Sequence, residues 1–114
     1  MANYLIMIYD NEAERERADA AVFEEVTRQH MEFARRNGAA LRGGARLGGS
    51  ATATSIRHGS DGTLTLTDGT FAETKEVLAG YYLIEAADLD EALEIAKQVP
   101  ARFGGVEVRP IIPS

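Results

Sequence analysis

Two residues carry the clearest acid–base chemistry in this chain, His30 and Asp68. A histidine can take up or release a proton near neutral pH, and a carboxylate beside it orients the ring and stabilises its protonated form. We predict that His30 acts as a general base and that Asp68 orients it. Two structural alternatives stay open: a core histidine bound to a backbone carbonyl, and an aspartate that binds backbone amides in the turn before Gly69.

Asp68 stands in a chemically rich loop, residues 67–76, between a threonine-rich strand and an apolar one. Loops on a rigid sheet often hold groups that contact ligands. Glu73 is predicted to be a second acid or base, and Lys75 to bind a substrate carboxylate or to keep Glu73 ionised. Phe71 would anchor the loop on the core. The predicted ligand contacts are Lys75, Thr74 and Tyr81. The alternative is a solvated run of charges.

Neither a metal nor an organic cofactor is predicted. A metal would accept His30, Asp68 and Glu73 as ligands, but the sequence holds no closely spaced ligand pair such as H-x-x-x-H. The glycine pairs at 43–44 and 48–49 lack the spacing of a phosphate-binding loop, and no G-x-S-x-G stretch indicates a serine nucleophile. The chain contains no cysteine, which excludes disulfides and thiolate chemistry.

The 114 residues have the length of a single domain, 1–114, with its own core. A formal net charge of −6 argues against nucleic-acid binding, which normally leaves a basic face. Local arginines can still attract an anionic small molecule. The apolar run at 4–9 lacks the basic flank of a signal peptide and is too short to cross a bilayer. We therefore expect a cytoplasmic protein with no membrane contact.

Hydrophobic periodicity predicts strands at 3–9, 39–47, 51–57, 63–67, 78–86 and 106–109. One helix should begin at Asp19 and end at Asn37, and a second should begin at the capping sequence 88–91 and end before Pro100. At about 100° per residue, His30 falls roughly 80° from Val22, inside the apolar arc of the first helix. The histidine should therefore face the core.

This order predicts an α+β fold, a ferredoxin-like βαββαβ sandwich with an extra hairpin strand and two helices on one face of an antiparallel sheet. The strands at 3–9 and 78–86 are apolar on both faces. Because two helices cover only one side, the other side needs a partner, and the simplest partner is the same face of a second subunit. The sequence therefore predicts a homodimer.

The loop at 67–76, with the sequence TDGTFAETKE, resembles the DGPF branch of the YCII-related proteins. The likeness extends to residues 4–9, 51–54, 80–84, 88–92 and 106–110. Thr70 departs from the pattern, since proline is usual there, and the turn should be less rigid. The resemblance implies a ferredoxin-like subunit in a dimeric α+β barrel, with a His–Asp site at His30 and Asp68. Members are mostly uncharacterised, and superfamily relatives include small enzymes of lactone isomerisation and dehydrochlorination.

Two functions follow from these observations. The first is a cofactor-independent enzyme that moves protons on a small anionic or cyclic metabolite. The second is a non-catalytic dimeric module that binds a small molecule or serves in stress regulation. The sequence alone does not separate an enzyme from a binding protein.

Overall fold

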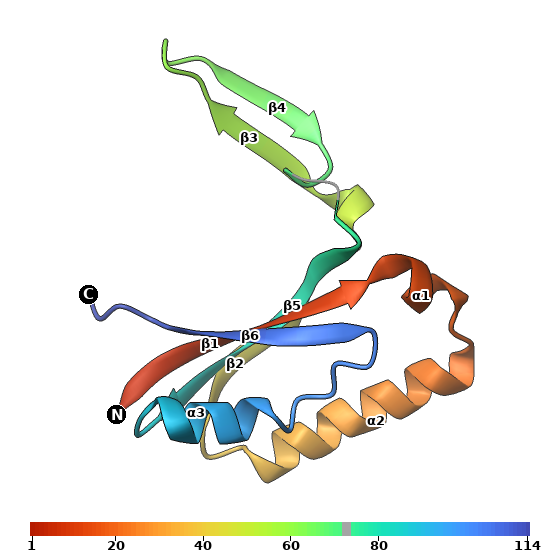
Figure 1. Ribbon diagram of the computed structural model, residues 1–114, viewed down its shortest axis with the longest axis vertical. Helices are drawn as coiled ribbons and strands as arrows, with labels where there is room; N and C mark the ends of the chain where they lie inside the picture. The colour runs from red at the N-terminus through yellow and green to blue at the C-terminus, as the bar shows by residue number, and fades with distance from the viewer. Residues whose placement is uncertain (72–73) are drawn as a thin grey trace.

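The computed structural model describes residues 1–71 and 74–114, and it has two parts (Figure 1). The body, residues 1–46 and 76–114, is a four-stranded sheet with helices on one face. The arm is a separate two-stranded hairpin, β3 (Thr54–His58) and β4 (Leu64–Asp68), that projects away from the body. This projection leaves the chain with a radius of gyration of 16.2 Å, against about 13 Å for a compact domain of this length.

The body sheet has the strand order β2-β5-β1-β6, and all neighbouring strands are antiparallel. Its strands are β1 (Ala2–Asn11), β2 (Leu41–Arg46), β5 (Glu76–Ala86) and β6 (Gly104–Pro110). In the centre, Ile6 of β1 lies opposite Tyr82 of β5 and Val108 of β6. The arrangement is compatible with a ferredoxin-like fold, and the predicted α+β class is confirmed.

The described part of the chain has three α-helices: α1 (Glu12–Arg17), α2 (Ala20–Arg36) and α3 (Leu89–Ala96). The two predicted helix starts are confirmed, because Asp19 accepts a hydrogen bond from the Val22 N–H (3.1 Å) and Asp88 accepts one from the Glu91 N–H (2.9 Å). Helix α1 is a short charged element that precedes α2 and has Asn11 as its N-cap. No helix among the described residues is long and apolar enough to cross a membrane.

The core lies between the helices and the face of the sheet that they cover. Strand β1 contributes alternate residues, which is the period expected of a strand with one face on the core. Phe33 of α2 is 2% exposed and Ile84 of β5 is fully buried. The buried core residues are Tyr4, Ile6, Ile8, Phe33, Ile84, Ala86, Ala92, Ile95, Ala96 and Val99.

The hairpin is where the structure differs from the sequence prediction. The strand expected at 51–57 begins only at Thr54, because residues Ser50–Thr52 form a 3-10 turn, η1. The carboxylate of Glu12, at the start of α1, accepts hydrogen bonds from the N–H and the hydroxyl of Ser50. These contacts hold the chain outside the sheet at this point, so the hairpin forms the arm and does not extend the sandwich.

Close packing of β6 on β1 provides a test of the fold. A Cβ atom on Gly104 would lie 2.0 Å from the Tyr9 carbonyl oxygen, whereas one on Gly105 would meet nothing within 4 Å. We expect Gly104→Ala to lower the free energy of unfolding by about 1–3 kcal/mol, as overpacking does. Gly105→Ala is the matched control and should leave it nearly unchanged. Urea unfolding of both variants measures the difference, and equal values would mean that β6 does not approach β1 so closely.

Candidate functional site

A cavity of about 650 Å³ opens between α2 and the sheet. Its lining comes from six parts of the chain: the ends of β1 and β2, Arg15 of α1, the inner face of α2, the middle of β5, and the segment just before β6. His30 from α2 and Tyr82 from β5 are both in this lining, so the predicted inward direction of His30 is confirmed. The cavity is thus formed by segments that lie far apart in the sequence.

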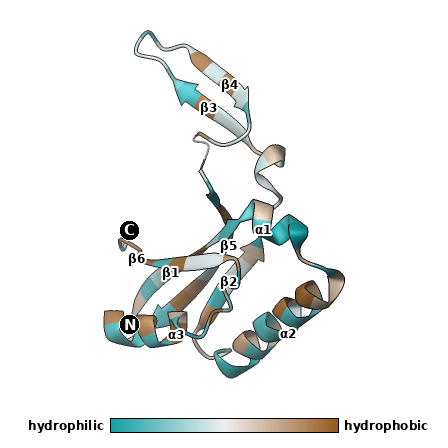
Figure 2. Cartoon of the chain, turned by 45° about the vertical axis from the view of Figure 1, so that its right-hand side comes forward, coloured by the Kyte–Doolittle hydropathy of each residue, from teal (hydrophilic) through white to brown (hydrophobic). Residues whose placement is uncertain are grey.

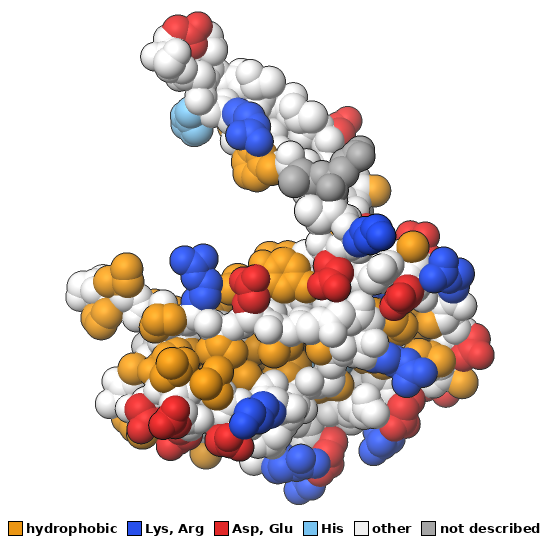
Figure 3. Space-filling model, in the orientation of Figure 1, with side chains coloured by type: hydrophobic (Ala, Val, Ile, Leu, Met, Phe, Trp, Pro, Cys, Tyr) orange, Lys and Arg blue, Asp and Glu red, His pale blue; other side chains and the backbone are white. Residues whose placement is uncertain are grey.

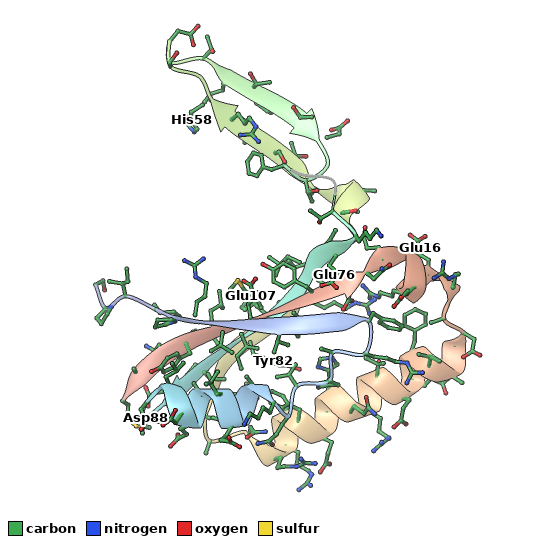
Figure 4. All side chains as sticks on the ribbon, in the orientation of Figure 1. Glu16, His58, Glu76, Tyr82, Asp88 and Glu107 are labelled. Atoms are coloured by element: carbon green, nitrogen blue, oxygen red, sulfur yellow. The ribbon has the colours of Figure 1, made fainter. Side chains whose placement is uncertain are left out.

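The phenol of Tyr82 forms a hydrogen bond with His30. The Tyr82 oxygen lies 2.7 Å from His30 Nδ1, and the two ring centroids are 5.9 Å apart. Phe33 supports the phenol from the core side, with ring centroids 4.7 Å apart. A Cβ atom on Gly44 of β2 would lie 2.8 Å from the Tyr82 ring, so this glycine makes room for it. Tyr82 lies on the helix side of the sheet (Figure 4).

Asp10 is a buried charged group in the same cavity lining, and it interacts electrostatically with His30. It is 8% exposed, and its carboxylate lies 3.6 Å from the Arg15 guanidinium. Burial raises the pKa of Asp10, while Arg15 and His30 act in the opposite direction. Burial lowers the pKa of His30, and Asp10 partly offsets this. Near neutral pH the His30 ring is therefore uncharged and ready to accept a proton.

The mouth of the cavity is basic although the chain as a whole is acidic. Arg46 and Arg102 are exposed in the lining, and neither forms an ion pair with any residue that the structure describes. The lining also has an apolar part, formed by Phe23 and Phe103, whose ring centroids are 6.3 Å apart. The cavity can hold a molecule that is apolar at one end and anionic at the other.

The single chain does not bring Asp68 to His30. Asp68 ends β4 in the arm, is exposed, and is absent from the cavity lining. The carboxylate that acts on His30 is Asp10. The predicted pairing of His30 with Asp68 therefore requires a second subunit and stays a prediction.

Of the other predicted site residues, Thr74 and Lys75 are not in the cavity lining, and Tyr81 is. Glu73 lies outside the described residues. Thr74 and Lys75 are exposed, and the Thr74 hydroxyl donates to the Glu76 carbonyl at 2.5 Å. Tyr81 belongs to the lining, but the strand alternation turns its side chain to the face opposite Tyr82. Their roles as ligand contacts stay predictions.

Phe71 does not anchor the loop on the core. Its ring is 63% exposed, and the Arg57 guanidinium of the arm lies 4.6 Å from its centroid. The reason is the position of the loop, which belongs to the arm and not to the body.

Sequence reasoning missed two residues of the site, Asp10 and Tyr82. A signal for Asp10 was available, because it continues the alternation of Tyr4, Ile6 and Ile8 and so falls on the buried face of the same strand. A carboxylate on a core-facing position is rare and points to a functional group. For the two adjacent tyrosines, the prediction named Tyr81 as the ligand contact, and the strand instead turns Tyr82 toward the helices (Figure 4).

The described residues contain no group of three or more histidine or acidic side chains that could hold a metal ion. The arrangement of His30, Tyr82 and Asp10 suits proton transfer in its own right, since each of them can donate or accept a proton.

Comparison with known proteins gives the family. A family model described as the YCII-related domain matches residues 2–114. The chain belongs to the YCII-related family. An uncharacterised protein of Rhizobium meliloti (strain 1021) is 46% identical over 70 residues, which is 59% of this chain. The match spans 56% of that relative, or about half of its length.

The lowered pKa of His30 predicts a pH dependence of stability. The ordinary value is 6.5, so just below pH 6.5 the unfolded chain binds more protons than the folded chain. The contribution of His30 to the free energy of unfolding should therefore fall as the pH drops from 6.5 through the lowered folded-state value. His30→Gln removes this loss. The free energy of unfolding of the variant should therefore increase relative to that of the natural protein as the pH falls. Urea unfolding on both sides of pH 6.5 measures the effect.

Met31→Ala, a change at the next residue of α2, whose exposed side chain carries no titrating group, is the control and should run parallel to the natural protein. A parallel curve for His30→Gln as well would contradict the lowered pKa of His30.

Proposed function

We propose that this YCII-related protein is a cofactor-independent enzyme that transfers a proton on a small anionic metabolite in the cavity. The observation that carries this proposal is the 2.7 Å contact between His30 Nδ1 and the Tyr82 oxygen, next to the buried carboxylate of Asp10. A histidine in this setting has the pKa direction that favours a base at neutral pH.

Each group has a role in the proposed reaction. When Nδ1 donates its proton to the Tyr82 oxygen, Nε2 presents a lone pair with which His30 removes a proton from the substrate. The imidazolium that forms is stabilised by Asp10, whose charge favours the protonated ring. If Nε2 returns the proton to a neighbouring atom of the substrate, the reaction is an isomerisation. If Nε2 gives the proton to a group that leaves the substrate, the reaction is an elimination.

The basic mouth supports an anionic substrate. Arg46 and Arg102 present guanidinium groups that can bind a carboxylate or a phosphate through paired hydrogen bonds. The aromatic pair Phe23 and Phe103 would contact the apolar part of the same molecule. This division would fix the substrate in one orientation relative to His30.

Turnover tests the proposal. Small carboxylates and phosphates that raise the melting temperature identify ligands, because a ligand of the folded state stabilises it. For a ligand that is converted, His30→Gln and Tyr82→Phe should lower kcat/KM by roughly 10²–10⁴-fold, the usual contribution of acid–base catalysis. Gln29→Ala is the control for a change on α2 outside the cavity. Ligands that bind and are released unchanged by the natural protein would instead support the non-catalytic binding module.

We also propose that the chain is a DGPF-type member that forms a homodimer of the α+β barrel kind. The support is the second face of the sheet, which none of the described helices covers (Figure 1). Leu5 and Met7 of β1 lie opposite Leu83 and Tyr81 of β5 on this open face, and all four are only half-buried. A second sheet packed on them would complete a core that one layer of helices leaves unfinished.

Light scattering should give about twice the chain mass of 12.3 kDa at micromolar concentration. A mass of one chain at that concentration would contradict the dimer and leave the open face without a partner.

A further inference from the structure

The arm exposes a row of large apolar side chains. Ile56, Leu64 and Leu66 are 48%, 56% and 65% exposed. Figure 2 shows hydrophobic positions recurring along β4 in the arm. Such a row on a projecting hairpin has no structural use in a single chain, because water surrounds it.

The pairing of the two strands puts this row on one face. Ile56 lies opposite Leu66, and His58 lies opposite Leu64, so all four side chains share a face of the hairpin. The other face carries polar residues: Ser55 opposite Thr67 and Arg57 opposite Thr65. The three apolar side chains of the strands thus share one face of the arm, while Phe71 contacts Arg57 of the other face.

A two-stranded hairpin is only marginally stable in water without a further packing surface. The body of the same chain does not supply one, since open space separates the arm from the body (Figure 3). The contacts at the base keep the arm in this position. The Gly69 N–H donates to the Ala53 carbonyl at 2.7 Å, and Glu12 of α1 binds the Ser50 N–H at 2.8 Å.

We propose that the apolar face of the arm, Ile56, Leu64 and Leu66, docks on the body of a second copy of this chain. The inference rests on the proposed homodimer and names the element that holds it together. In the proposed dimer the two open sheet faces meet, and each arm, which projects beyond its own body, lies against the body of the partner, so one two-fold axis satisfies both contacts at once.

The chemistry of the arm also favours a protein partner. The apolar face includes His58 and Asp68 but no lysine or arginine, so it lacks the basic groups that phosphate backbones or anionic lipids require. The open face of the body is flanked by Glu107 and Arg109 on β6, opposite Met7 and Leu5. Glu107 lies on the side of the sheet away from Tyr82 (Figure 4). An apolar centre with a charged rim is the usual composition of an interface.

A pair of double variants on one strand tests the arm. Leu64→Lys with Leu66→Lys places charges on the apolar face, and Thr65→Lys with Thr67→Lys places the same charges on the polar face of β4. Light scattering should find one chain mass, 12.3 kDa, for the first variant and twice that mass for the second. A first variant that remains a dimer would overturn the arm as the docking element while leaving the dimer intact. A monomeric natural protein would overturn both, and larger, open-ended assemblies would overturn the closed pair.

A second measurement does not require the lysine variants to fold. Because the chain has no cysteine, a polarity-sensitive dye can be attached at Leu66→Cys alone, with Thr65→Cys as the control. The emission at position 66 should shift to the red on dilution through the dissociation of the dimer, and the emission at position 65 should stay constant. Emission at position 66 that does not change while the mass halves would show that the arm lies outside the interface. None of these readouts involves turnover, so they succeed or fail independently of the proposed enzyme activity.

Discussion

The pairing of β1 with β5 is the constraint on which the other features of this protein depend. These two central strands run antiparallel from Ala2 opposite Ala86 to Asn11 opposite Glu76. One face supplies the core, with Ile6 and Ile84 fully buried, and it also supplies Asp10 and Tyr82 to the cavity. The other face supplies the half-buried row that a second subunit would cover. One ladder therefore positions the hydrophobic core, the candidate site and the proposed interface.

The irregularity in this ladder is located at the cavity. The register shifts between Ile8 and Tyr9, where Ala79 of β5 is left without a direct partner. Ile8 and Ala79 are both in the cavity lining. A bulge bends the strand and redirects the side chains beyond it, and bulges are frequent next to functional sites. The place at which Asp10 enters the interior is thus set by backbone geometry as well as by the alternation of residues.

Local patterns in the sequence predicted the elements well, because their causes are local. The caps of α2 and α3 depend on Asp19 and Asp88 and on residues within one turn of each. The position of His30 on the inner face of α2 followed from helical periodicity. The separation of the arm from the body was not predictable in this way. It depends on Glu12 reaching Ser50, 38 residues further along the chain, and no periodic pattern records that contact.

The site shows the same division between local and distant causes. The sequence identified the histidine but assigned its carboxylate to Asp68, the acid in the richest loop. The interior instead brings Asp10 toward His30, because both face the same side of the sheet and α2 packs across that side. A polar loop is a good guide to exposed chemistry. A single carboxylate at the end of an otherwise apolar strand was the better guide to buried chemistry, since burial of an acid is costly without a compensating group.

Helix α1 joins the two functional parts of the molecule. It has only six residues, yet Glu12 at its start holds the base of the arm and Arg15, one turn later, pairs with Asp10 in the cavity. An isolated helix of this length has little stability of its own. Its position is therefore fixed by these two polar contacts and by the Asn11 cap, whose side chain accepts from the Glu14 N–H at 3.1 Å. The direction of the arm and the charge balance around His30 are consequently linked through one turn of this short helix, from Glu12 to Arg15.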